Sequence, residues 1–294
     1  MRPDRPRGTR LRVMDVSDPC RWPTPKQLRA GGKRKAGQQS IDFLVKKRVK
    51  WVKLRCKKVP TMSRKKGGRS RMAQVIRTIR RVPPALVDRY RGLSSATVHE
   101  ASGGKGALSS GIKPISPEMR ICGPVVTVRI RPGDNLMLHK AIYVAEPGDV
   151  IVADAGGYRE AGAWGEIMAV AALARGIAGL VFNGAVRDSQ LMIDLPFPVF
   201  ACGLSIKGTE KVSLGWINHA LNLDNITIDP GDLILGDRDG LVVVAGEEAE
   251  AVLAASLARE EKEEVIKERL RRGESTLDVY GFGDILKARG LTEE

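Results

Sequence analysis

The sequence lacks several features that mark common classes of protein. Its four cysteines are widely spaced and form no C-x-x-C pair, which excludes a paired-cysteine zinc site and a disulfide framework. No apolar run reaches membrane-spanning length, and no apolar stretch follows the first arginines as in a secretory signal. An H-E-x-x-H motif, a P-loop and a nucleotide-binding glycine loop are also missing. These absences favour a protein of the reducing cytoplasm without a membrane segment.

Acidic residues are scarce in the first part of the chain, and this divides the sequence in two. Residues 1–80 carry a net charge of +22 and residues 81–294 a net charge of −7, within a total of +15. High charge with few apolar residues predicts that 1–82 is a basic, disordered extension. A nucleic-acid partner is therefore expected only through this tail. A merely solvated extension, or a natural start at Met72, explains the same composition.

The remaining residues, 83–294, are long enough for one domain with a sizeable core. Alternating helical and strand-like patterns predict a mixed sheet flanked by helices. The strands are expected at 125–130, 150–153, 177–182, 199–202 and 226–228, with a hairpin of 233–235 and 241–245. The helices are expected at 84–91, 95–101, 135–144 and 166–175, and a long charged helix over 247–272.

The tripeptide Pro-Gly-Asp occurs three times, at 132–134, 147–149 and 230–232. Proline fixes φ, glycine supplies a positive φ, and aspartate can accept a hydrogen bond from nearby backbone. The repeated motif therefore predicts three turns rather than a catalytic signature.

Glu166 and the pair Arg187-Asp188 are the strongest candidates for a functional site. Twenty residues separate Glu166 from Arg187, and they form a helix-like stretch, an apolar strand-like run and a turn. Such a unit returns the chain to the point where the helix began, at the end of a sheet where ligands of α/β proteins bind. Two carboxylates suit Mg²⁺ or Mn²⁺, and an arginine can hold a carboxylate or enolate oxygen.

The helix that begins near Gly165 offers a second element of this site. The first amides of a helix have no acceptor within the helix, so the backbone of Gly165, Glu166, Ile167 and Met168 could receive a substrate carboxylate. The presence of Glu166, Arg187 and Asp188 at these positions also has purely structural explanations. Glu166 also suits the first turn of a helix as a favourable charge, and Arg187-Asp188 also suits a surface ion pair.

Residues of about 92–246 resemble the RraA-like family, which includes the class II 4-hydroxy-4-methyl-2-oxoglutarate aldolases. The family's signature, an acidic residue followed after twenty positions by Arg-Asp, is present as Glu166, Arg187 and Asp188. Glu166 stands where the best-known aldolases carry aspartate, which bears on substrate preference. The other matching stretches are Leu93–Val98, Gly123–Thr127, Pro132–Leu136 with His139, Pro147–Val152, Asp154–Gly157, Trp164–Met168, Ala174–Gly176, Asn183–Asp188, Phe197–Phe200, Lys207–Thr209, Pro230–Asp232 and Gly240–Val244.

The resemblance implies a swivelling β/β/α-type domain that assembles as trimers or hexamers, with active sites between subunits. It also implies a divalent-metal-dependent lyase that cleaves 4-hydroxy-4-methyl-2-oxoglutarate or a related 4-hydroxy-2-oxo acid to pyruvate and an oxo acid. The reaction passes through a metal-stabilised enolate, which oxaloacetate decarboxylation shares.

The residues then have expected roles at this site. Asp188 binds Mg²⁺ or Mn²⁺ directly, and Glu166 holds a metal-bound water. Arg187 and the metal polarise the 2-oxo group, while the amides of Gly165–Met168 receive the substrate carboxylate.

Two other functions remain open at the level of sequence. Lys140 could form a Schiff base as in metal-independent aldolases, which requires a desolvated lysine. Some relatives are described as protein inhibitors of an RNA-processing nuclease, so the chain could instead bind a ribonuclease. His139 and Lys207 are weaker candidates that a structural histidine and a solvated lysine explain equally well.

Overall fold

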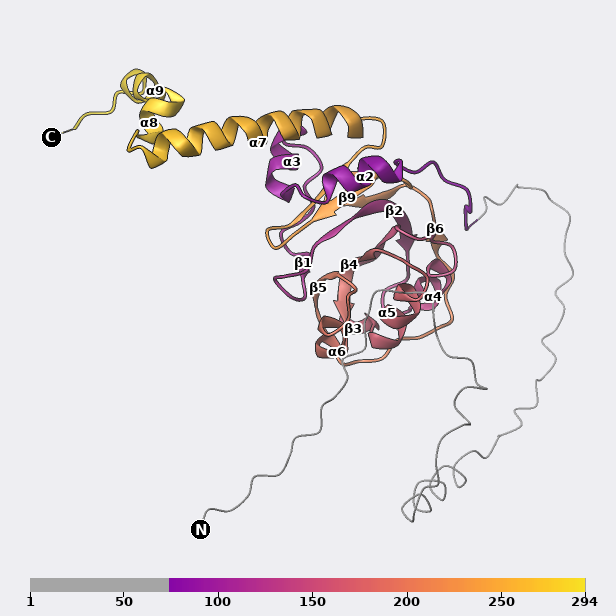
Figure 1. Cartoon of the computed structure of the whole chain (residues 1–294). Helices are drawn as coiled ribbons and strands as arrows, with labels where there is room; N and C mark the ends of the chain where they lie inside the picture. Colours follow the sequence, from indigo (N-terminus) through magenta and orange to yellow (C-terminus); the bar gives the residue numbers. More distant parts are fainter. Residues whose placement is uncertain (1–73, 294) are drawn as a thin grey trace, which may run out of the picture. The chain divides into compact units, whose positions relative to one another are not determined.

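The computed structural model describes residues 74–293, and a mixed sheet of eight strands forms their centre (Figure 1). The order across the sheet is β1-β5-β4-β3-β2-β9-β10, and β6 pairs with β2 beside this path. The strands of this sheet are β1 (Lys113–Pro114), β2 (Ile121–Arg129), β3 (Val150–Trp164), β4 (Gly179–Val186), β5 (Val199–Leu204), β6 (Trp216–Ile217), β9 (Leu233–Gly236) and β10 (Leu241–Val244). A separate two-stranded sheet joins β7 (Leu221–Leu223) to β8 (Ile226–Ile228).

The helices occupy the connections and one end of the sheet. They are α2 (Pro84–Tyr90), α3 (Ser95–Ala101), α4 (Leu136–Ala141), α5 (Glu166–Leu173), α6 (Ser189–Ile193), α7 (Ala249–Arg271), α8 (Thr276–Tyr280) and α9 (Phe282–Ala288). The expected mixed sheet flanked by helices is therefore confirmed. In the part of the chain that the structure describes, no helix is both long and apolar enough to cross a membrane.

The central strands β2, β3, β4 and β5 pair in parallel, and α4, α5 and α6 lie in the connections between them. Strands of this kind are buried on both faces, which explains why their apolar runs are nearly continuous. Successive residues of β3 show the two faces. Ile151 and Ala153 pack with the α4 and α5 side, whereas Val150 and Val152 pack with the β7–β8 and β9–β10 side.

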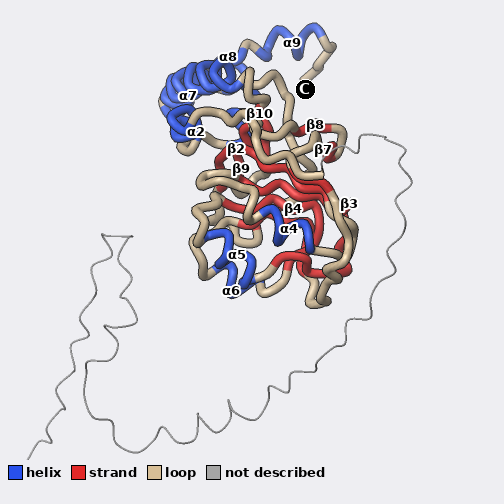
Figure 2. The backbone as a smooth tube through the Cα atoms, turned by 90° about the vertical axis from the view of Figure 1, so that its right-hand side faces the viewer, coloured by secondary structure: helices blue, strands red, loops and turns tan. Residues whose placement is uncertain are grey.

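A third apolar cluster lies between α2, α3 and α7 and the antiparallel strands β9 and β10. Figure 2 shows α2 and α7 at the end of the molecule that carries β10, while α5 and α6 lie toward the opposite end. The hydroxyl of Tyr90 donates to the carbonyl oxygen of Ala249 at 2.6 Å, which ties α2 to the start of α7. Ser94 caps α3, since its side chain accepts from the amide of Thr97.

Several predicted elements differ from those observed. The strand expected at 150–153 extends to Trp164, and residues 183–186, expected to lead into a turn, belong to β4. The helix expected at 135–144 is confined to 136–141. The two strand differences share a cause, because strand pairing between distant segments decides where an extended segment ends. The patterns also gave no prediction of β1, β6, β7, α6, α8 or α9.

The three Pro-Gly-Asp motifs form turns, as predicted. Gly133, Gly148 and Gly231 have φ values of 76°, 89° and 96°. The aspartates accept hydrogen bonds from backbone amides: Asp149 from Glu146, and Asp232 from Asp229 and Gly246. The third aspartate, Asp134, also accepts from a distant loop, as described below.

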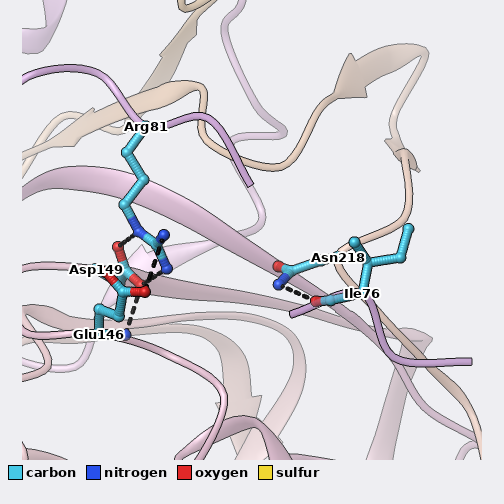
Figure 3. Close-up of polar contacts among 5 residues, drawn as sticks. All are labelled: Ile76, Arg81, Glu146, Asp149 and Asn218. Atoms are coloured by element: carbon cyan, nitrogen blue, oxygen red, sulfur yellow. Dashed lines mark hydrogen bonds and ion pairs between the residues drawn. The ribbon is translucent and has the colours of Figure 1, made fainter. Parts of the chain in front are cut away.

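The segment before α2 lies along the domain. The amide of Ile76 donates to the carbonyl oxygen of Ile217, and Nδ2 of Asn218 donates to that of Ile76 (Figure 3). Arg81 forms two hydrogen bonds, of 2.8 and 2.9 Å, to the carboxylate of Asp149, whose side chain is 1% exposed. Residues 74–82 thus contact the domain, although they belong to the predicted extension. Its remaining part, 1–73, lies outside the described residues.

Candidate active site

The site begins where β3 runs into α5. Gly165 has an extended backbone, with φ −153° and ψ −175°, and Glu166 is the first helical residue. The carbonyl oxygen of Gly165 accepts from the amides of Met168 and Ala169 at 3.0 and 3.1 Å. Among the described residues, no backbone oxygen accepts from the amides of Glu166 and Ile167. The amide of Met168, one of the residues expected to bind an anion, thus donates within the first turn of α5.

Arg187 and Asp188 follow β4, which lies beside the end of β3. Val186 is the register partner of Trp164, and the amide of Arg187 donates to the carbonyl oxygen of Trp164 at 2.9 Å. This pairing confirms the prediction that helix, strand and turn bring the chain back to the point where α5 begins. The backbone of Asp188 has a left-handed conformation, with φ 55° and ψ 36°. Its carbonyl oxygen accepts a hydrogen bond from the amide of Met192 in α6.

The side chains of Arg187 and Asp188 lie against Gly165. A Cβ atom placed on Gly165 would stand 2.5 Å from Oδ2 of Asp188, and 3.1 and 3.2 Å from Cγ and Nε of Arg187. The structure thus brings the pair Arg187-Asp188 to the amide end of α5. Glu166, next to Gly165, is half-buried at the same end.

The two charged side chains face solvent and are only loosely paired. Nε of Arg187 lies 3.6 Å from Oδ2 of Asp188, and the side chains are 47% and 38% exposed. This separation is longer than a hydrogen bond, so both groups keep capacity for other partners. In the described range, no group of three or more His, Cys, Asp or Glu side chains is arranged to hold a metal ion.

A loop after β5 supports the site from the other side. The amide of Ser205 donates to the carbonyl oxygen of Val186, and the amide of Gly162 donates to that of Lys207, each at 2.9 Å. Asp134 fixes the end of the loop, because its buried carboxylate accepts from the amides of Val212 and Ser213 at 2.8 Å. Burial alone would raise the pKa of Asp134, but these bonds and one from the Leu136 amide outweigh it and lower the pKa.

The weaker candidates from the sequence are Lys207, His139 and Lys140. Lys207 is an exposed lysine whose Nζ contacts a carboxylate oxygen of Glu160 at 2.7 Å, and this hydrogen bond raises the pKa of Lys207. Burial lowers the pKa of His139, and the charge of Lys211 lowers it further. Lys140 is exposed, so the desolvation that a Schiff-base lysine requires is not met in this chain.

Asn135 has no role that the sequence patterns predict, and it lies beside the start of α5. Asn135 is 7% exposed, and its Nδ2 donates to the carbonyl oxygen of Ala163 at 2.9 Å. The same nitrogen lies 3.6 Å from the sulfur of Met168, so Asn135 joins the start of α4 to β3 and α5. Its Oδ1 is buried without a hydrogen-bond partner among the described residues. The feature of the sequence that could have pointed to Asn135 was its position directly after the turn at 132–134.

Comparisons with known proteins agree with this fold. A protein of Halalkalibacterium halodurans named "Putative 4-hydroxy-4-methyl-2-oxoglutarate aldolase" is 36% identical over 179 residues, which cover 61% of this chain and 85% of that protein. A solved structure of an uncharacterised protein from Pseudomonas syringae pv. tomato is 31% identical with a TM-score of 0.59, covering 67% of this chain and 97% of that one.

A second solved structure points to another activity within the same fold. It is Streptomyces coelicolor RraAS2, described as an unusual member of the RNase ES inhibitor RraA protein family. That structure is 25% identical with a TM-score of 0.58, and the match covers 65% of this chain and 99% of that one. The profile of the RraA-like family, described as Aldolase/RraA, matches residues 85–243, more than half of the sequence. This chain, with its candidate site at the junction of β3, α5 and β4, belongs to the RraA-like family.

Proposed function

We propose that this chain is a divalent-metal-dependent lyase that releases pyruvate from 4-hydroxy-4-methyl-2-oxoglutarate or a related 4-hydroxy-2-oxo acid. Oxaloacetate decarboxylation is proposed as a second activity of the same site. One observation carries the proposal: Arg187 and Asp188 meet the amide end of α5 at Gly165. The similarity to a protein named as an aldolase supports the reaction class.

The chain's own groups have distinct roles in this reaction. The amides of Glu166 and Ile167, which have no backbone acceptor among the described residues, bind the carboxylate of the pyruvate unit. The guanidinium of Arg187 donates to the 2-oxo oxygen, where negative charge develops as the carbon–carbon bond breaks. Fixed donors aimed at such an oxygen stabilise the transition state more than the ground state.

The carboxylates suit a metal that keeps much of its own water. Oδ2 of Asp188 lies 3.6 Å from its arginine partner, which leaves its lone pairs available. Mg²⁺ typically binds one or two carboxylates and retains several waters, so the small donor set of Asp188 and Glu166 fits it. Asp188 would bind the ion directly and Glu166 through water. A bound ion would supply Lewis-acid polarisation of the 2-oxo group.

We further propose that the site is completed by a second copy of the chain, in a trimer or hexamer. Large apolar side chains surround it while exposed to solvent, which is unusual for a surface without a partner. Ile167 is 75% exposed, Leu191 50%, Leu204 59% and Ile206 95%. They lie on α5, on α6, at the end of β5 and in the loop after β5, next to Arg187 and Asp188, so a subunit that covers them would also enclose the substrate.

A pyruvate-release assay over a panel of 2-oxo acids tests the proposed lyase. We expect release from 4-hydroxy-2-oxo acids and oxaloacetate with Mg²⁺ or Mn²⁺, loss with EDTA, and restoration when the metal is returned. Activity that survives EDTA, with pyruvate trapped on the protein by borohydride, would point to a lysine Schiff base and contradict the proposal.

Ribonuclease inhibition is the second candidate, because the Streptomyces structure is described as belonging to an inhibitor family. An inhibitor needs a binding surface but no intact acid–arginine–acid set. If the wild-type protein and Asp188→Ala inhibit a ribonuclease equally well, and the wild type releases no pyruvate, this function would be established instead.

A further inference from the structure

The strand that leads to the site, β3, pairs irregularly with β4 over part of its length. Asp154 of β3 pairs in register with Asn183 of β4, but the next partners are Tyr158 with Gly184 and Gly162 with Ala185. The chain thus advances eight positions on β3 for two positions on β4. Residues 155–161 form this excursion, and Gly156 and Gly157 turn it with φ values of 65° and 73°. Bulges of this kind redirect side chains beside functional sites.

A buried carboxylate stands where the excursion begins. The side chain of Asp154 is 4% exposed. Its Oδ1 accepts from the amide of Gly156 at 2.7 Å and from Nδ2 of Asn183 at 2.8 Å, and Oδ2 pairs with Nη1 of Arg129 at 2.8 Å. A buried carboxylate is costly unless it is compensated in this way. Asp154 therefore fixes the first turn of the excursion to the neighbouring strands on both sides.

Asn183 extends the same network across the sheet. Its Oδ1 accepts from the thiol of Cys202 on β5 at 3.2 Å. The register of β4 with β5 also shifts here, between Phe182 and Ala185. Side chains thus link the four adjacent strands β2, β3, β4 and β5 at the positions where the regular pairing of β3 with β4 and of β4 with β5 ends.

The excursion determines where the site residues lie. On its return, Gly162 packs so closely that an added Cβ would stand 2.7 Å from Cβ of Arg187 and 2.3 Å from the oxygen of Ser205. Trp164 then accepts from the Arg187 amide, and Gly165 meets Asp188. A change in the register shifts between β3 and β4 would therefore move Gly165 relative to Arg187 and Asp188.

We infer that Asp154 is a positioning residue for this site, acting through Gly156 and Asn183 on the excursion that places Gly165 beside Arg187-Asp188. The inference rests on the proposed lyase function for its kinetic consequence. Asp154 touches neither Arg187 nor Asp188 in any contact of the structure, so its effect on activity would be transmitted by backbone geometry.

Asp154→Ala tests the inference, and Asp149→Ala is the matched control. Both aspartates are buried, both pair with an arginine, and they stand five positions apart on the same segment. Asp149 lies before β3, at the end away from the site. Both variants should lose stability. Only Asp154→Ala should also lose kcat, by at least about tenfold with KM changed less than about threefold, because misplacement of about 1 Å can cost about 100-fold in rate.

Conservative variants separate positioning from general disruption. Asp154→Asn retains a carbonyl oxygen for Gly156 and Asn183, so it should restore kcat to within about threefold of wild type. Arg129→Gln removes only the contact of a half-exposed arginine and should leave kcat near wild type. If Asp154→Ala does not fold, Asn183→Ala breaks the hydrogen bond between Asp154 and β4, together with the contact to Cys202, and should show the same loss of kcat.

Hydrogen exchange gives a readout that does not depend on activity. Amides of residues 162–168 should exchange at least about tenfold faster in Asp154→Ala, or in Asn183→Ala, than in Asp149→Ala, because the excursion opens locally. If wild type releases no pyruvate, the proposed lyase function fails and exchange alone decides the positioning role. Equal exchange in the variant and the control, or faster exchange with unchanged kcat in an active enzyme, would overturn the inference.

Discussion

Oδ2 of Asp188 lies against the backbone of Gly165, 2.5 Å from the position that a Cβ would occupy. No residue other than glycine leaves this approach open. The contact joins a turn after β4 to the first amides of α5, two segments that are separated by more than twenty positions in the sequence. The proposed chemistry depends on this closeness, and the first prediction follows from it.

Gly165→Ala should lower pyruvate release by at least about 100-fold, because the methyl group displaces Asp188 and crowds the amides that bind the substrate carboxylate. Gly240→Ala is the control, since nothing lies within 4 Å of an added Cβ at Gly240 and its φ is not positive. The measurement is kcat/KM for both variants with Mg²⁺. Near-wild-type activity of Gly165→Ala would show that this contact does not form in the working enzyme.

Substitutions of Asp188 should separate its charge from its backbone conformation. Asp188 has φ 55°, a left-handed conformation that asparagine tolerates and alanine adopts at a cost of roughly 1–2 kcal/mol. Asp188→Asn should therefore lose activity while its melting temperature stays near that of wild type, whereas Asp188→Ala should lose both. Pyruvate release and thermal unfolding report the two effects. Wild-type pyruvate formation by Asp188→Ala would remove Asp188 from the mechanism.

Glu166→Asp tests the departure from the aspartate of the best-known aldolases. Both side chains carry a carboxylate in the first turn of α5, so dependence on Mg²⁺ or Mn²⁺ should persist. The shorter side chain should change the ranking of substrates, because it alters the reach to metal-bound water. The assay compares kcat/KM across the 2-oxo acid panel. Complete inactivity would instead show that the longer carboxylate is essential here.

Arg81→Leu should destabilise the domain by roughly 3–5 kcal/mol, because it leaves the carboxylate of Asp149 buried without its charged partner. Arg81 itself is only 18% exposed in this pair. Arg91→Leu is the control, since Arg91 pairs with Asp88 on the surface, where such bonds contribute about 0–1 kcal/mol. Urea unfolding measures both. Equal stability of the two variants would mean that segment 74–82 contributes little to the domain.

The pH dependence of stability should reveal the buried carboxylate of Asp134. Its pKa is lowered in the folded protein, so its contribution is present above the unfolded value of about 3.9 and is lost as pH falls through the folded pKa. Asp134→Asn should therefore reduce the free energy of unfolding at pH 7 and narrow the gap to wild type toward pH 3. A gap that is constant over this range would assign the effect to packing rather than charge.

Much of the local structure could be predicted because short segments determine it. Ser94 precedes α3 with an oxygen that can cap it, and the three Pro-Gly-Asp motifs contain the residues that their turns require. The start of α5 at Glu166 followed from an apolar helical stretch that begins after Gly165. The return of the chain to Arg187 was predicted from the order of helix, strand and turn, since such a unit has few ways to close.

The sequence by itself thus determined the mixed architecture, the turns, and which charged residues meet near the start of α5. Only the tertiary structure decided how they meet. The length of β3, its excursion after Asp154 and the contact of Gly165 with Asp188 depend on register between strands that are distant in sequence. Register is fixed by many cross-strand contacts together, and a bulge changes it without a distinctive local pattern. That is why the contacts of Asp154 and Asn135 became visible only when the strands were paired.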